Sequence, residues 1–198
     1  MTILTLASGS AIRASLLRNA GLDIVVHPVR VDEATIRESL LADGASSRDI
    51  ADALAEHKAL KGSTRAPEAL VLGCDQILDC DGRLYAKPMD PADAVAQLRS
   101  LRGKTHRLFT AAVLYDRGQP VWRHVNVPRL TMRPLSDALI DDYVSRNWDD
   151  IRHCVGCYQI EGPGVRLFEH IEGDLFSIQG LPLLELLTIL IQRKDIQG

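Results

Sequence analysis

The sequence lacks three things: a long hydrophobic run, a surplus of basic residues, and a basic segment at its start. No apolar stretch approaches the roughly 20 residues that a membrane-spanning helix needs, so we expect no membrane segment. Lysine and arginine (23) are outnumbered by aspartate and glutamate (26), which argues against a general nucleic-acid-binding protein, because such proteins are usually basic. The opening residues, MTILTL, carry no basic charge, so we expect no secretory signal and a cytoplasmic location.

Cysteines are few, and their spacing leaves two interpretations. Cys154 and Cys157 are spaced as in many zinc or thiol redox sites, and His153 precedes them. Cys74 and Cys80 are separated by five residues, more than a zinc knuckle usually allows. We expect buried thiols that stay reduced. The alternative is a zinc or redox protein, which metal analysis of the purified protein would identify.

The order of the predicted elements indicates an α/β fold. Capping residues and apolar periodicity predict helices at about 11–20, 47–61, 91–102, 137–146 and 183–193, the first four capped by Ser10, Ser46 or Ser47, Asp90 and Ser136. Apolar and β-branched runs predict strands at 3–6, 24–29, 69–73 and 165–171, a hairpin around residues 81–82, and a second hairpin with strands 106–115 and 121–133 around the turn 116–118. We therefore expect a mixed twisted sheet with flanking helices and a central cleft, in a single domain over residues 1–198 that forms two lobes.

A turn of very small residues follows the first predicted strand. Ser8, Gly9 and Ser10 let backbone N–H groups approach a ligand closely, and the helix that starts after them has a partially positive N-terminus. Arg13 in its first turn adds a planar donor fork suited to phosphate oxygens. We therefore predict that Ser8, Ser10 and Arg13 bind phosphate.

Two carboxylates and two lysines could complete this site. Asp75 closely follows strand 69–73, and Glu33 follows strand 24–29. Carboxylate oxygens are the ligands that Mg²⁺ prefers, and Lys58 and Lys87 would offset the about four negative charges of a triphosphate. Lys58 also lies at the edge of the apolar arc of its helix, a position that equally fits a solvated lysine packed along its stem.

Taken in order, these segments resemble the Maf-like family of nucleoside triphosphate pyrophosphatases, also called septum-formation-inhibitor-like proteins. The resemblance runs nearly end to end, and its landmarks are residues 6–13, 32–33, 56–59, 73–76, 87–88, 103–106 with Thr110, and 180–183. It implies a fold similar to that of the inosine-triphosphate pyrophosphatases. It also implies hydrolysis between the α- and β-phosphates of a nucleotide, with a divalent cation, Mg²⁺ or Mn²⁺, as cofactor.

The resemblance also implies residue roles. Asp75 is the general base, Glu33, Lys58 and Lys87 complete the catalytic set, and Glu33 and Asp75 hold the metal. Base and metal ligand can be the same carboxylate, and the sequence leaves that choice open. Asp32 would instead cap or orient the loop. The expected partner is a nucleoside triphosphate and not a nucleic-acid polymer, and since related proteins are often dimers, a homodimer stays open.

Three positions distinguish branches of the family: Ile12, Gln76 and Glu161. The branch that acts on dTTP and UTP has Arg, Thr and Gln there, whereas the branch that resembles 7-methyl-GTP pyrophosphatases has Trp, Gln and Glu. The Glu161 carboxylate can accept both the N1–H and the N2 amine of guanine, and methylation at N7 adds a positive charge that it favours. We therefore expect a 7-methyl-GTP-like substrate.

The competing interpretation is a non-catalytic nucleotide-binding regulator of cell division, to which the family's older name points. An inactive member of the family would be expected to lose Asp75, Glu33 or Lys87. All three are present, which favours the enzyme.

Overall fold

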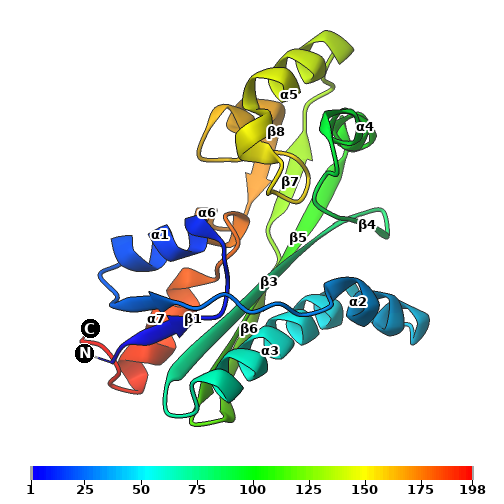
Figure 1. The fold of residues 1–198 in the computed structure, drawn as a ribbon. Coiled ribbons are helices and arrows are strands. Elements are labelled where there is room, and N and C mark those ends of the chain that lie inside the picture. The colour runs from blue at the N-terminus through cyan, green and yellow to red at the C-terminus, as the bar shows by residue number, and fades with distance from the viewer. Residues whose placement is uncertain (1, 198) are drawn as a thin grey trace.

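In residues 2–197, which the computed structural model describes, eight strands form one mixed sheet with helices on both faces (Figure 1). The strand order is β2-β1-β3-β5-β7-β8, with β4 beside β3 and β6 beside β5. β1 runs parallel to β2 and β3, and all other pairs are antiparallel. The expected mixed α/β sheet with flanking helices is confirmed.

The strands are β1 (Leu4–Leu6), β2 (Ile24–Val26), β3 (Leu70–Cys80), β4 (Arg83–Tyr85), β5 (Thr105–Asp116), β6 (Gln119–Asn126), β7 (Arg129–Met132) and β8 (Phe168–Glu172). The helices are α1 (Ala11–Asn19), α2 (Glu33–Ala42), α3 (Ser47–Arg65), α4 (Pro91–Leu101), α5 (Asp137–Ile151), the 3₁₀ helix η1 (Pro163–Leu167), α6 (Leu175–Ile178) and α7 (Leu183–Gln192). Within residues 2–197, none of these helices has the length and apolarity that crossing a membrane requires.

The predicted helix starts are confirmed by their caps. Ser10, Ser46, Asp90 and Ser136 each accept a hydrogen bond from the backbone N–H three residues later, which satisfies one of the free donors of the first turn. At α3 the cap is reciprocal, because the Asp49 carboxylate accepts from the backbone N–H of Ser46.

The prediction that the third strand ends before Asp75 is wrong. β3 continues to Cys80 because β5 pairs with it along its whole length, from Leu70 opposite Asp116 to Asp79 opposite Arg107. The shorter neighbour β1 pairs with β3 only as far as Leu72. Asp75 therefore lies in the middle of a strand, at the point where the parallel neighbour on one side has ended.

Other boundaries also differ from the predictions. Helix α3 runs past Gly62 to Arg65, and the segment 121–133 forms two strands, β6 and β7, separated near Pro128. The predicted strand 165–171 is η1 followed by β8, and α5 extends five residues beyond its expected end at Arg146. Helices α2 and α6 were not predicted. Asp32 caps α2 through Thr35, in accord with the capping role considered for it.

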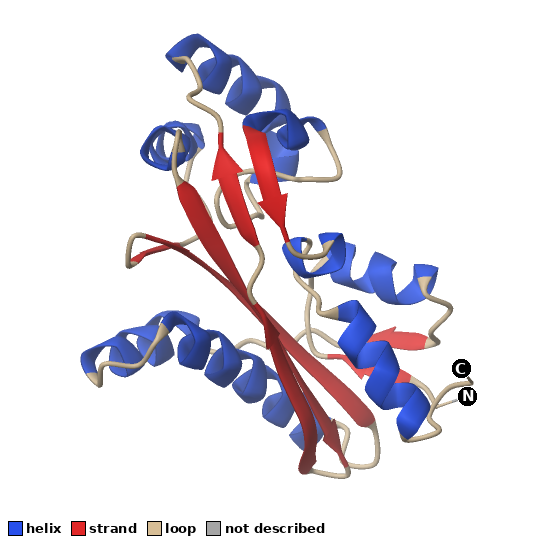
Figure 2. Ribbon diagram, turned by 180° about the vertical axis from the view of Figure 1, so that it is seen from behind, coloured by secondary structure: helices blue, strands red, loops and turns tan. Residues whose placement is uncertain are grey.

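The long strands at the centre of the sheet extend through the molecule, with helices on both sides of them (Figure 2). The apolar residues form three cores that follow the alternation of side chains along the sheet. Val71 and Ile77 of β3 face α3. Leu70, Leu72 and Cys74 face the opposite way, into a core that also contains residues of α1 and α7. Further along that second face, Leu78 joins a third core with residues of α4, α5, β7 and β8. β3 and β5 thus run through both halves of the molecule.

Helix α3 crosses β3 in direct backbone contact at Gly73. A Cβ atom at this position would lie 2.2 Å from the Ala55 carbonyl oxygen and 2.4 Å from the Ala59 nitrogen. The helix offers only small residues there, and both alanines are fully buried. Because side chains alternate, Asp75 lies on the same face of β3 as Gly73 and so is directed toward α3.

We expect Gly73→Ala to lower the free energy of unfolding by at least about 2 kcal/mol, because a methyl group at this contact must push α3 off the sheet. Urea denaturation measures the change. The matched control is Gly162→Ala: Gly162 has a negative φ of -125°, and a Cβ there would find its nearest neighbour at 4.0 Å. Equal stability of the two variants would contradict the proposed role of the contact.

Candidate active site

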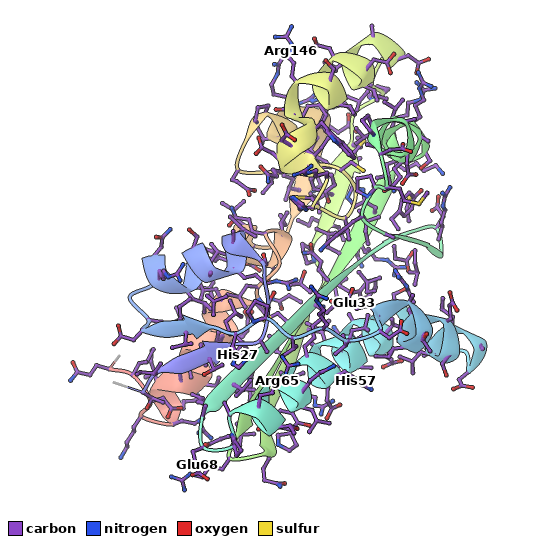
Figure 3. The ribbon with its side chains drawn as sticks, in the orientation of Figure 1. His27, Glu33, His57, Arg65, Glu68 and Arg146 are labelled. Atoms are coloured by element: carbon purple, nitrogen blue, oxygen red, sulfur yellow. The ribbon has the colours of Figure 1, made fainter. Side chains whose placement is uncertain are left out.

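Three predicted residues from three elements meet at one ammonium group. Lys58 of α3 lies 2.5 Å from Asp75 Oδ1 on β3 and 2.7 Å from Glu33 Oε1 at the start of α2, each distance measured from Nζ. Lys58 and Asp75 are buried, whereas the Glu33 side chain is half exposed. Figure 3 shows where Glu33 lies, at the start of α2. The solvated alternative for Lys58 is thereby excluded.

The electrostatic environment shifts the pKa values of the two carboxylates in opposite directions. Burial raises the pKa of the Asp75 carboxyl above its ordinary value, although the positive charges of Lys58 and Arg13 oppose the shift. Burial also acts to raise the pKa of Glu33, but here Lys58, with smaller contributions from Lys87 and Arg37, outweighs it and lowers the pKa. Asp75 is therefore the stronger base of the two, and Glu33 the more firmly ionised.

The small-residue loop is preorganised by its own hydroxyl groups. Ser8 Oγ accepts a hydrogen bond from the backbone N–H of Ser10, and Ser10 Oγ accepts one from that of Arg13. Among residues 2–197 no partner is found for the backbone N–H groups of Gly9, Ala11 and Ile12. These groups lie at the N-terminus of α1, where such donors suit an anion.

Arg13 ties this loop to β3 and to the C-terminal part of the chain. Its Nη1 donates to the Cys74 carbonyl at 3.0 Å and to Ser8 Oγ at 3.3 Å, and its Nε donates to the Gly180 carbonyl at 2.7 Å. No partner is found for Nη2 in the described part of the chain, so this end of the guanidinium remains able to bind a phosphate oxygen. Cys74 directly precedes Asp75, so the loop with Arg13 and the cluster of Lys58, Glu33 and Asp75 meet on β3.

The remaining predicted residues make no hydrogen bond or ion pair with Lys58, Glu33 or Asp75 in the described part of the chain. Lys87 is exposed, and its charge contributes to lowering the pKa of Glu33. Ile12 is half-buried in the first turn of α1, and Glu161 is exposed in the turn that precedes η1. Gln76 is held by protein groups: its Nε2 donates to Thr110 Oγ1 and to the carbonyls of Ser177 and Ile178.

The two carboxylates fit a divalent cation whose remaining ligands are substrate phosphates and water. In residues 2–197 no group of three or more His, Cys, Asp or Glu side chains is arranged to hold a metal. Glu33 and Asp75 each use one oxygen on Lys58, and each has a second carboxylate oxygen for which no hydrogen bond is found in the described part of the chain. Mg²⁺ commonly takes one or two carboxylates and completes its shell with substrate phosphates and water, and this donor set fits that pattern.

The thiols are placed unfavourably for redox chemistry. Cys74, Cys80 and Cys157 are buried, and Cys154 is half-buried. Burial raises the pKa of the Cys74 thiol to about 11 and raises those of Cys154 and Cys157 as well. Since the thiolate is the reactive form, these are poor nucleophiles at neutral pH.

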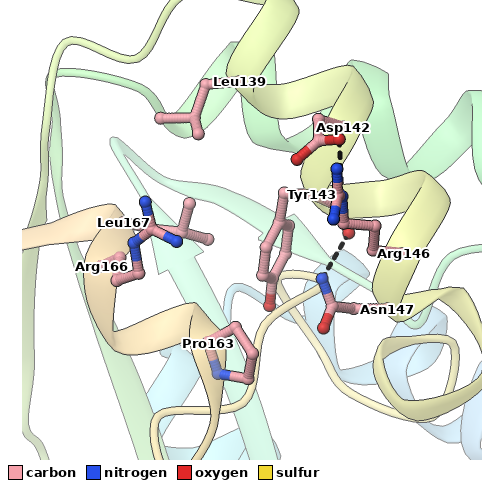
Figure 4. A pocket seen from close by; sticks show the side chains of 8 residues that line it. All are labelled: Leu139, Asp142, Tyr143, Arg146, Asn147, Pro163, Arg166 and Leu167. Carbon is pink, nitrogen blue, oxygen red and sulfur yellow. Dashed lines mark hydrogen bonds and ion pairs between the residues drawn. The ribbon is translucent and has the colours of Figure 1, made fainter.

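A separate pocket lies between α5 and η1 (Figure 4). Its volume is about 190 Å³, and its lining includes Tyr143, Arg146, Pro163 and Arg166. None of the predicted site residues lines it, and Figure 3 places Arg146 far from Glu33. It is a surface feature of the other half of the molecule.

Sequence reasoning missed helix α2 and the polar contacts behind the site. Asp32 followed by Thr35, with apolar Ile36 and Leu40 four residues apart, was a usable signal for α2. No local signal joins Thr110 to Ser177 or Gly180 to Arg13, because these contacts link residues distant in the chain.

The chain is similar to several known proteins. A family profile described as Maf-like protein matches residues 3–193. A protein of Ruegeria pomeroyi named nucleoside triphosphate pyrophosphatase is 56% identical over 98% of each chain, and a protein of Brucella abortus named 7-methyl-GTP pyrophosphatase is 44% identical over 100% of each. Among solved structures, a nucleoside-triphosphatase, or dITP/XTP pyrophosphatase, of Mycobacterium abscessus aligns with 98% of this chain and 96% of its own, at 15% identity and a TM-score of 0.45.

We expect Lys58→Met to lower the free energy of unfolding by about 3 kcal/mol near neutral pH, because Asp75 loses the charge that compensates its burial. The loss should depend on pH. Without Lys58 the folded-state pKa of Asp75 lies further above its unfolded value, so the penalty is full above that pKa and disappears as pH falls through it and the folded protein takes up a proton.

Urea denaturation at about pH 8 and about pH 5 measures this difference. The control is the double variant Lys58→Met/Asp75→Asn, which removes both charges and should recover much of the lost stability. A deficit that is equal at both pH values and unchanged in the double variant would contradict the assignment.

Proposed function

The chain belongs to the Maf-like protein family, and we propose that it is a nucleoside triphosphate pyrophosphatase, hydrolysing its substrate to a monophosphate and pyrophosphate. One observation carries the proposal: Lys58 holds Glu33 and Asp75 together beside the loop that Arg13 ties to Cys74. An anion-binding loop next to a buried carboxylate is what hydrolysis of a phosphoanhydride requires.

The loop and its cations would bind the phosphates. The free N–H groups of Gly9, Ala11 and Ile12 and the unused Nη2 of Arg13 provide donors, and Lys87 adds charge at the exposed side. These groups would neutralise the triphosphate and hold it for attack, which supplies most of the catalysis in phosphoryl transfer.

Asp75 would act as the general base. Its raised pKa makes it a stronger base than a solvated aspartate, and the adjacent Lys58 ammonium favours its ionised form. Asp75 accepts a proton from water as the water oxygen bonds to the α-phosphorus. The bond from that phosphorus to the bridging oxygen breaks, and pyrophosphate leaves with the electron pair.

We propose that the enzyme uses a divalent cation, Mg²⁺ or Mn²⁺, held by Glu33 and Asp75. The second oxygens of both carboxylates are the available ligands. When bound, the cation would neutralise charge and polarise the phosphate. A cytoplasmic location and a homodimer are further parts of the proposal that await measurement.

We further propose a preference for 7-methyl-GTP-like substrates. Glu161 is exposed and has no hydrogen-bond partner among residues 2–197, so its carboxylate is free to accept the paired donors of a guanine base. The similarity to the Brucella abortus 7-methyl-GTP pyrophosphatase supports this choice.

Pyrophosphate release tests the reaction directly. The panel holds 7-methyl-GTP, GTP, UTP, dTTP, CTP and ATP, each with Mg²⁺ or Mn²⁺. We expect turnover by the wild type and a loss of at least about 100-fold in Asp75→Asn, because the amide cannot accept the proton. Asp43→Asn, the same change on an exposed residue, is the control and should keep full activity. Nucleotide binding without turnover would favour the regulator instead.

Glu161→Gln tests base recognition. We expect the ratio of kcat/KM for 7-methyl-GTP to that for UTP to fall by about tenfold, since the amide offers one acceptor where the carboxylate offers two. Glu169→Gln on β8 is the matched exposed control. A substrate profile that Glu161→Gln leaves unchanged would remove Glu161 from base recognition without affecting the proposed reaction.

A further inference from the structure

A polar pair, the half-buried Gln76 and the completely buried Thr110, separates two of the apolar cores. On β3, Cys74 belongs to the core with α1 and α7, and Leu78 belongs to the core with α4 and α5. Gln76 lies between them on the same face, and Thr110 of β5 is its direct cross-strand partner. Thr110 is completely buried, and its hydroxyl accepts a hydrogen bond from Gln76 Nε2 at 2.8 Å.

This pair binds the C-terminal end of α6. Thr110 Oγ1 donates to the Ser177 carbonyl at 2.7 Å, and Gln76 Nε2 approaches the carbonyls of Ser177 and Ile178 at 2.9 Å and 3.1 Å. The Ser177 carbonyl also accepts the backbone N–H of Gly180 at 3.1 Å, so Thr110 and Gln76 add side-chain donors to a carbonyl that already closes the turn. Ile178 packs in the core with α4 and α5. The two side chains therefore set where this turn lies on β3 and β5, together with the packing of Ile178.

Two further hydrogen bonds hold Ser177. Asp174 Oδ1 accepts from the Ser177 N–H at 2.8 Å, and Asn126 Nδ2 of β6 donates to Ser177 Oγ at 2.8 Å. Ser177 is completely buried. Its backbone and its side chain are therefore both fixed by neighbouring elements.

Arg13 depends on the residues that follow α6. Gly180 has a φ of +103°, and its carbonyl accepts the 2.7 Å hydrogen bond from Arg13 Nε. A Cβ atom at Gly180 would lie 3.1 Å from Nε and 3.2 Å from Nη2, so the guanidinium lies directly against the glycine. Moving this segment would move or release Arg13.

We propose that Thr110 is a positioning residue for the phosphate site, acting through the Ser177 carbonyl and the Gly180 carbonyl on Arg13. The inference rests on the proposed function in one respect, because it takes Arg13 as a phosphate-binding residue. Thr110 itself touches no substrate. Its hydroxyl fixes segment 177–180, and that segment fixes the direction in which Arg13 presents its free Nη2.

The test compares Thr110→Val, which keeps the shape and removes the hydroxyl, with Thr110→Ser, which keeps the hydroxyl. Isothermal titration with pyrophosphate measures the phosphate site without requiring turnover. We expect Thr110→Val to weaken pyrophosphate binding by about tenfold and Thr110→Ser to bind as the wild type does. A role in stability alone would change the melting temperature of Thr110→Val and leave its pyrophosphate affinity intact.

Introducing Thr110→Val into an Arg13→Ala background tests whether Thr110 affects phosphate binding through Arg13. If Thr110 acts through Arg13, adding Thr110→Val to Arg13→Ala should change the affinity by less than about twofold. A full tenfold loss in that background, or unchanged binding by folded Thr110→Val, would overturn the inference. Should Thr110→Val not fold, Thr110→Ala, which also removes the hydroxyl, replaces it in both comparisons.

The outcomes separate the inference from the proposed function. A wild type that binds pyrophosphate but hydrolyses no nucleotide of the panel defeats the proposed reaction, and the dependence of Thr110→Val on Arg13 would still stand. A wild type that binds neither pyrophosphate nor any nucleotide overturns both. If the wild type turns substrate over, Thr110→Val should raise KM more than it lowers kcat, because Asp75 and Lys58 lie on the other face of β3.

Discussion

The contact between α3 and β3 at Gly73 is the constraint on which the site depends. Backbone touches backbone there, with only Ala55 and Ala59 on the helix side. This places Lys58, next to Ala59, within reach of Asp75, two residues beyond Gly73 on the same face of the strand. A larger side chain in the contact would separate a buried charge from its partner.

Lys58 serves two carboxylates with different surroundings. Asp75 is buried and has a raised pKa, whereas Glu33 is half exposed and has a lowered one. A buried ion pair gains little net stability, because desolvation of the charges offsets their attraction. The arrangement is consistent with the proposed chemistry, since Lys58 favours the ionised form of Asp75 beside the loop proposed to bind phosphate.

β3 distributes the functions of the site between its two faces. Asp75 is directed to α3, while Gln76, its neighbour in sequence, is directed to α6 and the cross-strand residue Thr110. Arg13 contacts the strand one residue before Asp75, at the Cys74 carbonyl. Three consecutive residues, Cys74 to Gln76, thus join the proposed base on one face to the segment proposed to position phosphate on the other.

The sequence by itself determined the α/β class, the capped helix starts and the residue types of the site. Ser10, Asp90 and Ser136 act through the first turn that follows them, and such local effects can be recognised without a structure. It also assigned Lys58 to the site through the family resemblance, while helical periodicity alone left its role open. The end expected for the strand before Asp75 was wrong because pairing with β5, over thirty residues away in sequence, extends β3.

Tertiary structure alone decided which of these residues meet. The Lys58 ammonium between Glu33 and Asp75, and the Arg13 guanidinium on Gly180, join segments that local signals do not connect. Thr110 is one of the landmarks of the family resemblance, but the sequence assigns it no role, and the inference that it positions Arg13 rests on its burial against the end of α6. The physical reason is common to all three: propensity and capping act within a few residues, whereas burial and ion pairing depend on which distant segments the sheet brings together.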